Sequence, residues 1–118
     1  MAIPKRTTFD EVLADLEVLK ILKKQTDLRP ALEVALSLVD DAERLGGPGA
    51  PPPAYTEEAA IIYRKMRDFN GEVAVLERYE ERCRRAGGPP PGKSGKRVLA
   101  RLDKARKLRD EHALDSEG

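Results

Sequence analysis

The sequence predicts an all-α protein of about five helices, arranged as two tandem antiparallel helical hairpins followed by a C-terminal capping helix. Apolar residues recur three and four positions apart through most of the chain, which is the pattern of a helix with one buried face. Gly-Gly-Pro, a helix-terminating sequence, occurs at residues 46–48 and again at residues 87–89. The segments before these two stops echo each other 41 residues apart, so that Ile21, for example, matches Ile62. Such a fixed-period echo is typical of helical repeat arrays.

The composition fits one small helical domain, which we place at residues 8–113 between an N-terminal tail (1–7) and a C-terminal tail (114–118). The chain has 118 residues, of which 40% are hydrophobic and 36% charged, and it has no Trp. Its core is therefore built mainly from Leu, Val, Ile and Ala, a mixture that suits close-packed helices. No run approaches the roughly 18–20 apolar residues that span a bilayer, so we expect no membrane partner.

The first hairpin is expected at residues 8–45. Thr8 and Glu11 form an S/T-x-x-E capping box, which satisfies the free backbone donors at a helix start. The first helix then carries a stripe of apolar side chains at helical spacing: Phe9, Val12, Leu13, Leu16, Leu19 and Leu22. Asp27 is the expected N-cap of the second helix, which ends at the first Gly-Gly-Pro.

A Pro/Gly linker at residues 46–53 leads to the second hairpin at residues 54–86. Pro53 suits the first turn of its first helix, and Asn70-Gly71 is expected to separate the two helices. A second linker follows at residues 87–93. The capping helix is then expected at residues 94–113, with Ser94 as its N-cap. Its single apolar stripe consists of Val98, Leu99, Leu102, Ala105 and Leu108.

The second hairpin resembles a tetratricopeptide repeat (TPR). That family has small residues on its first helix, a Tyr near the end of that helix and an Asp-aromatic turn, and Ala59, Ala60, Tyr63, Asp68 and Phe69 match these features. The resemblance implies a right-handed stack of hairpins that binds other proteins on a concave face lined by the first helix of each hairpin.

Two positions depart from the family pattern. The family's small residue early in the second helix is Glu72 here, and its Gly before the turn Asp is Arg67. The repeat is also longer than in the family, and the additional residues lie in the Pro/Gly linker. These departures make the chain a divergent TPR-like array.

In the TPR-like register, five basic residues line the concave face of the array. Lys23 and Arg64 occupy equivalent positions in the two hairpins, as do Lys24 and Lys65. A groove lined in this way binds an acidic peptide or a C-terminal carboxylate through charge-assisted hydrogen bonds. An ordinary solvated helix face is the alternative interpretation. The predicted peptide-binding residues are Lys20, Lys23, Lys24, Arg64 and Lys65.

The capping helix provides a second candidate surface. Residues 93–112 contain eight Lys or Arg against three Asp or Glu, and a basic helix can follow the phosphates of a nucleic acid. No aromatic residue that could stack on a base interrupts the basic residues, so a solvated face is the favoured interpretation and nucleic-acid binding is the alternative. The residues of this nucleic-acid hypothesis are Arg101, Lys104, Arg106, Lys107 and Arg109.

Charge is also divided unevenly between the halves of the chain. Residues 1–60 carry 7 Lys or Arg against 11 Asp or Glu, whereas residues 61–118 carry 15 against 10. An acidic half and a basic half favour charge-steered association, including association between two copies of the chain. A homo-oligomer is therefore among the expected partners.

No set of catalytic or metal-binding residues can be assembled from the sequence, and we expect a non-enzymatic protein without a cofactor. His112 is the only histidine and Cys83 the only cysteine, which excludes the usual metal clusters. Residues 87–94, GGPPPGKS, formally fit a phosphate-binding loop, but three prolines provide no N–H groups for phosphates. The better interpretation is a Pro-rich linker.

Cys83 itself lies on an apolar helix face, which favours a small core residue. A thiol activated by the neighbouring Arg82, Arg84 and Arg85 is the alternative. Because one cysteine cannot form an internal disulfide, we expect a cytoplasmic protein.

Overall fold

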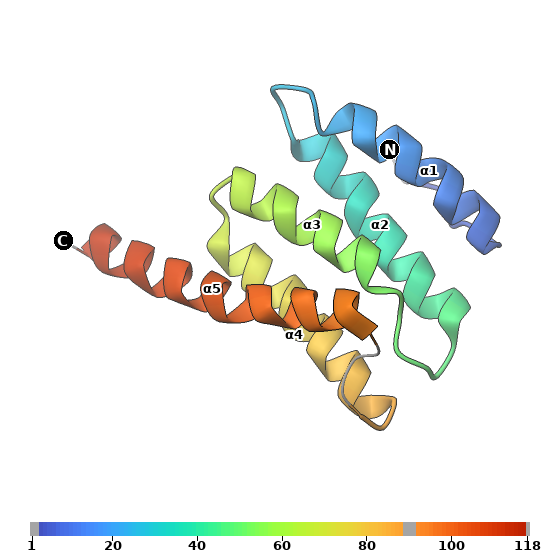
Figure 1. Ribbon diagram of the computed structural model, residues 1–118. Helices are drawn as coiled ribbons and strands as arrows, with labels where there is room; N and C mark the ends of the chain where they lie inside the picture. The colour runs from blue at the N-terminus through green and yellow to red at the C-terminus, as the bar shows by residue number, and fades with distance from the viewer. Residues whose placement is uncertain (1–2, 89–91, 118) are drawn as a thin grey trace.

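The structure is a computed structural model, which describes residues 3–88 and 92–117, with side chains as far as residue 113. The described residues form five helices and no strand, which confirms the predicted all-α class (Figure 1). The helices are α1 (Phe9–Leu22), α2 (Arg29–Gly46), α3 (Pro53–Lys65), α4 (Phe69–Arg85) and α5 (Gly92–Glu117).

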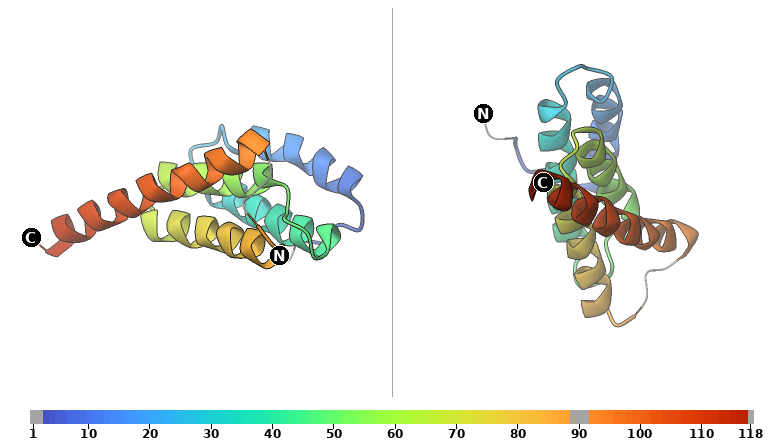
Figure 2. Two further views of the ribbon diagram at one scale, coloured as in Figure 1. Left: turned by 60° about the horizontal axis from the view of Figure 1, so that its bottom comes forward. Right: turned by 90° about the vertical axis from the view of Figure 1, so that its left-hand side faces the viewer.

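The helices lie in two layers. Figure 2 (left) shows α1, α3 and α5 in one layer and α2 and α4 in the other. Each helix packs against the next one along the chain, and α5 contacts α3 as well as α4. The first helix of each hairpin therefore shares a layer with the last helix, and one face of the molecule is formed by α1, α3 and α5.

Side chains stabilise two of the helix starts. Thr8 is the N-cap of α1, as predicted, and its Oγ1 accepts a hydrogen bond from the Glu11 backbone N–H at 3.3 Å. The prediction that Asp27 caps α2 is wrong, because the N-cap position is Leu28. Asp27 instead pairs with the side chain of Arg29 and accepts the Arg29 backbone N–H at 3.1 Å.

Two predicted boundaries shift toward the N-terminus. Asn70-Gly71 does not separate α3 from α4, because Asp68 caps α4 and the two residues lie in its first turn. The Asp68 carboxylate accepts the Gly71 N–H at 2.9 Å, which fixes this start. Ser94 is not the N-cap of α5, since that helix begins at Gly92. The helix also continues to Glu117, through most of the predicted C-terminal tail.

The turn between α3 and α4 depends on a left-handed residue. Arg67 has φ of 60°, a conformation that favours glycine, and the Asp68 N–H donates to the Tyr63 carbonyl at 2.9 Å. Arg67 is the residue that replaces the glycine of the resembled family. Just beyond the turn, a Cβ on Gly71 would lie 2.3 Å from the Tyr63 ring. The absence of a side chain at Gly71 therefore lets Tyr63 pack directly on α4.

The core is aliphatic, with Tyr79 as its largest fully buried side chain. The apolar stripe predicted for α5 is buried along most of its length, and Cys83 of α4 also belongs to the core. The stripe predicted for α1 is only partly buried, because Val12 and Leu19 face α2 whereas Phe9 and Leu13 are exposed. The reason is that α1 has one helical neighbour, α2.

Replacing Gly71 with alanine tests the close contact between Tyr63 and α4. The added methyl group displaces the Tyr63 ring, and we expect Gly71→Ala to lower the free energy of unfolding by about 1–3 kcal/mol. Gly46→Ala is the matched control, because a Cβ at this helical position meets no atom within 4 Å. It should be neutral or stabilising by up to about 1 kcal/mol. Urea unfolding measures the free energy of unfolding of both variants. An equal change in the two would contradict the close contact between Tyr63 and α4.

Candidate functional site

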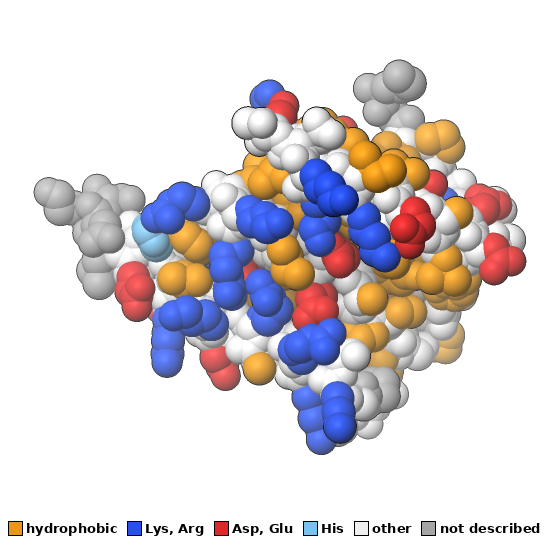
Figure 3. Space-filling model, turned by 45° about the horizontal axis from the view of Figure 1, so that its top comes forward, with side chains coloured by type: hydrophobic (Ala, Val, Ile, Leu, Met, Phe, Trp, Pro, Cys, Tyr) orange, Lys and Arg blue, Asp and Glu red, His pale blue; other side chains and the backbone are white. Residues whose placement is uncertain are grey.

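The face formed by α1, α3 and α5 is rich in basic side chains. Figure 3 shows Lys and Arg side chains gathered across this side of the molecule, with apolar side chains exposed between them. The basic residues of this face come from all three helices, and we refer to them as the basic face. They are Lys20, Lys23 and Lys24 at the end of α1, Arg64 and Lys65 on α3, and Arg97, Arg101 and Lys104 on α5.

A buried carboxylate lies beneath the middle of the basic face. Glu72, in the first turn of α4, has no exposed surface. Its Oε1 accepts a hydrogen bond from Arg64 Nε at 3.0 Å, and its Oε2 lies 2.7 Å from Arg64 Nη2. Arg101 Nη2 on α5 lies 3.7 Å from the same Oε2. Glu72 therefore joins α3, α4 and α5.

The Glu72 cluster contains more positive than negative charge. Two guanidinium groups share one carboxylate, and both arginine side chains remain partly exposed. Arg101 Nε is buried and has no hydrogen-bond acceptor among the described residues. A second anion from outside would complete the charge balance of Arg64 and Arg101, since a guanidinium can bind carboxylates along more than one edge.

Carboxylates of α3 bind the neighbouring basic residues. Lys23 donates to Glu58, which ties the end of α1 to α3. Arg97 of α5 makes two hydrogen bonds to Glu57, at 2.7 and 2.8 Å. The bond from Arg97 lowers the pKa of Glu57 and outweighs burial, which acts in the opposite direction. These pairs hold the three helices of the face together.

The five predicted peptide-binding residues lie on the basic face, but they are not equally available. Lys23 and Arg64, at equivalent positions in the two hairpins, are both engaged by carboxylates of the chain itself. Lys20 pairs with Glu17 at 3.1 Å on an exposed surface. Lys24 and Lys65 are exposed. A ligand on this face would therefore meet the lysines first.

The predicted nucleic-acid residues of α5 differ in how far carboxylates of the chain itself engage them. Arg101 faces the Glu72 cluster, whereas Arg106 pairs with Glu77 of α4 at 3.1 Å. Arg109 contacts the neighbouring Asp110 at 3.2 Å. Lys104 and Lys107 are exposed. Three of the five residues are thus paired with carboxylates of the chain itself.

The sequence also contains His112, Cys83 and a phosphate-loop sequence as candidates for chemistry. His112 stacks on the Phe69 ring, with 4.5 Å between ring centroids, and Arg67 lies over the same ring. Cys83 is buried, so the interpretation as a core residue is confirmed. Of the phosphate-loop sequence, residues 89–91 lie outside the described residues, and the preceding element is the helix α4. Over the described part of the chain, no group of three or more His, Cys, Asp or Glu side chains is arranged to hold a metal ion.

From the sequence we expect no segment long and apolar enough to span a membrane, and the described helices can be compared with this expectation. None of them combines the length and apolar character needed to cross a bilayer.

A second polar cluster, which the sequence did not predict, lies around Arg6 in the predicted N-terminal tail. Arg6 is only 4% exposed and lies between α1 and α2. Its side chain reaches Asp15 at 2.6 Å, Ser37 at 3.0 Å and Asp41 at 2.9 Å, and its backbone N–H donates to Asp41 at 3.1 Å. Arg44 also pairs with Asp41, at 2.8 Å. The segment before α1 is therefore fixed to the helices.

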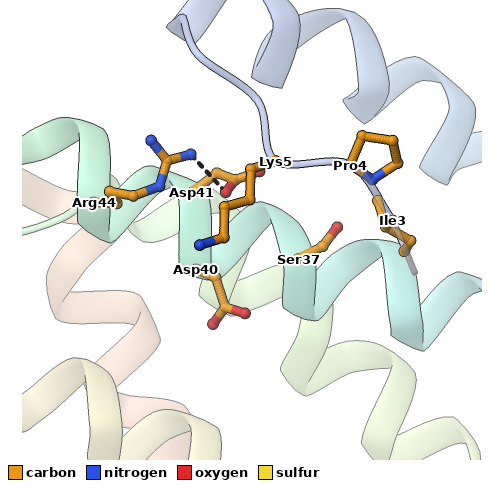
Figure 4. A pocket seen from close by; sticks show the side chains of 7 residues that line it. All are labelled: Ile3, Pro4, Lys5, Ser37, Asp40, Asp41 and Arg44. Atoms are coloured by element: carbon orange, nitrogen blue, oxygen red, sulfur yellow. Dashed lines mark hydrogen bonds and ion pairs between the residues drawn. The ribbon is translucent and has the colours of Figure 1, made fainter.

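A shallow cavity of about 330 Å³ borders the Arg6 cluster (Figure 4). Lys5 extends over α2 on one side, and Asp40, Asp41 and Arg44 come from α2 itself. Cations and carboxylates alternate around this cavity, so its lining favours neither anions nor cations.

Comparisons with known proteins do not identify the chain. No protein family, no curated protein and no solved structure matches it. The candidate function therefore depends on the geometry of this molecule.

Removing the Glu72 carboxylate should strongly destabilise the protein. Glu72→Ala leaves two partly buried guanidinium groups without their counter-charge, and we expect a loss of about 3–5 kcal/mol in the free energy of unfolding. Glu77→Ala is the matched control on the same helix, because Glu77 forms an exposed pair with Arg106. Its expected loss is about 0–1 kcal/mol. Similar losses in urea unfolding would contradict the role assigned to Glu72.

The Arg6 cluster makes stability depend on acid pH. Burial alone would raise the pKa of Asp41, but hydrogen bonds from Arg44 and Arg6 outweigh it and hold the pKa below its ordinary value of 3.8. The contribution of Asp41 to stability is therefore present above the unfolded-state pKa and disappears as the pH falls through the folded-state pKa. The difference in unfolding free energy between the native chain and Asp41→Asn should shrink below about pH 4. A difference that stays constant down to full protonation would show that the carboxylate is not stabilised in this way.

Proposed function

We propose that this chain is a non-enzymatic, TPR-like interaction module whose basic face binds an acidic segment of another protein. The observation that carries the proposal is the Glu72 cluster, in which Arg64 and Arg101 share one buried carboxylate while both arginine side chains remain partly exposed. The surplus positive charge is held by helix packing. A ligand carboxylate therefore meets guanidinium groups that have already lost much of their conformational freedom.

Three features of the second hairpin support the TPR-like assignment. The turn before α4 needs a left-handed residue at Arg67, where the resembled family has glycine. Asp68 caps the following helix. Ala59 and Ala60 are fully buried on α3, where the family requires small residues. Where the family has a small residue early in the second helix, this chain has Glu72, which pairs with Arg64 of α3 and lies near Arg101 of α5.

An acidic segment would lie across α3 and α5. Its carboxylates would bind the exposed edges of Arg64 and Arg101, and Lys65 and Lys104 extend the same charge on either side. Such charge-assisted hydrogen bonds are stronger than neutral ones. Because the lysines are exposed, binding should weaken as salt is added, and the charge should act mainly on the association rate.

The test uses residues that do not support the fold. A Lys65→Glu/Lys104→Glu double variant reverses two exposed charges and leaves the Glu72 cluster intact. We expect its affinity for a fluorescein-labelled oligoglutamate peptide to fall about tenfold or more, equivalent to about 1.4 kcal/mol. Fluorescence anisotropy at low salt measures the affinity, and circular dichroism checks the helicity.

The matched control reverses the same number of charges elsewhere on the surface. Lys96 and Lys107 are exposed lysines of α5, whereas the ion pairs of Glu72 are made by Arg64 and Arg101. A Lys96→Glu/Lys107→Glu variant has the same net charge as the test variant and should retain most of the affinity. An equal loss in both variants would mean that net charge alone attracts the peptide, and it would overturn the basic-face assignment.

A labelled single-stranded oligonucleotide distinguishes the nucleic-acid hypothesis. Arg101 and Arg106 each contact a carboxylate of α4, which predicts weaker binding to the oligonucleotide than to oligoglutamate at the same ionic strength. Tighter, salt-sensitive binding to the oligonucleotide would favour nucleic acid as the ligand instead.

A further inference from the structure

The outer surface of α1 is unusually apolar. Leu13 is 55% exposed, Val18 46% and Ile21 63%, and Phe9 lies at the edge of the same surface. Among the described residues, Met66 is the only other large hydrophobic side chain with comparable exposure. The exposed apolar area is thus concentrated on one helix, although isolated exposed hydrophobic side chains are common on protein surfaces.

The apolar side chains of α1 cover both of its sides. Val12 and Leu19 face α2, and Leu13, Val18 and Ile21 face away from it. A surface helix of a globular protein typically has its apolar residues on one face and charged or polar residues on the other. The helix at the other end of the stack, α5, follows this pattern, because its outer side is charged. The outer surface of α1 therefore has the composition of an interface.

Charge along α1 identifies the kind of partner that fits this surface. Asp10 lies in its first turn and Glu17 near its middle, whereas Lys20 and Lys24 lie at its C-terminal end. All four are exposed. The surface is thus acidic toward one end and basic toward the other, which makes it complementary to itself when two copies meet in opposite directions.

We propose that the chain forms a two-fold dimer through antiparallel packing of α1 against α1 of a second copy. This arrangement places Asp10 opposite the partner's Lys24 and Leu13 opposite the partner's Ile21, with Glu17 near the two-fold axis. A parallel arrangement would place like charges together. The two-fold interface uses the same patch on both copies, as isologous interfaces do.

The interface is small, so the dimer is weak. Stable interfaces bury about 800 Å² on each partner, and one helix of 14 residues provides less than this. Association should therefore depend on concentration, with dissociation in the micromolar range or above. The dimer uses Lys20 and Lys24 of the basic face and leaves α5 exposed. Its test remains separate from that of peptide binding, because peptide binding is tested with substitutions outside α1.

Sedimentation equilibrium over a range of protein concentrations tests the dimer. The average mass of the native chain should rise from monomer toward dimer, and a Leu13→Glu/Ile21→Glu variant should remain monomeric with unchanged helicity. Met66→Glu is the control, since it places a charge on an exposed apolar side chain outside α1. A native chain that stays monomeric at millimolar concentration overturns the proposal, as does equal dissociation by Met66→Glu.

Charge reversal tests the antiparallel pairing. A Lys20→Glu/Lys24→Glu variant has an acidic α1 surface, and an Asp10→Lys/Glu17→Lys variant has a basic one. Each alone should self-associate at least tenfold more weakly than the native chain. Their equimolar mixture should recover association, because each then meets its complement. A mixture that associates no better than its components overturns the electrostatic part of the proposal.

Oxidative cross-linking tests the direction of the helices. In an antiparallel pair, residues near the middle of α1 meet their own copy, whereas residues near its ends do not. Glu17→Cys should therefore form a disulfide-linked dimer readily, and Asp10→Cys should not. Equal cross-linking by both variants would show a parallel arrangement and overturn the antiparallel one. The native Cys83 is buried and serves as the background control.

Discussion

The packing of the second hairpin depends on a single buried carboxylate. Glu72 lies in the first turn of α4 and forms ion pairs with Arg64 of α3 and Arg101 of α5. Three helices therefore meet at one charged group. A buried ion pair of this kind adds little net stability compared with an apolar core. Its effect is on specificity, because any other docking of α5 would leave the charge of Glu72 less well compensated. The position of α5 is thereby linked to the register of the α3–α4 hairpin.

The same carboxylate determines the charge of the face above it. Glu57 and Glu58 each bind one cation, Arg97 and Lys23, which fastens α5 and α1 to α3. Glu72 is shared by two guanidinium groups, so charge is not cancelled at the centre of the face. The interactions that hold the three helices in one layer thus leave a positive surface where they meet. In this chain, structure and candidate function use the same arginines.

The sequence predicted the class and the order of the helices because these depend on local patterns. Apolar spacing, the Thr8 cap and the two Gly-Gly-Pro stops act within one or two turns of a helix. The roles of Glu72 and Arg6 could not be predicted, since a charged residue in a sequence is normally exposed. Their burial depends on partners 8 to 35 residues away. For the same reason, the sequence placed Lys23 and Arg64 in the candidate site without showing that Glu58 and Glu72 engage them.

The two end helices of the stack, α1 and α5, differ in the side chains that they expose. A helical stack buries each hairpin against its neighbours, and its two end helices lack a neighbour on one side. At one end, the exposed side chains of α5 include charged residues such as Lys96, Lys104 and Lys107. At the other end, α1 exposes Leu13, Val18 and Ile21, and the cluster around Arg6 anchors its N-terminal side to α2. Because Arg6 joins Asp15 of α1 to Asp41 of α2, the side of α1 that faces α2 is fixed, and these side chains stay on its outer side.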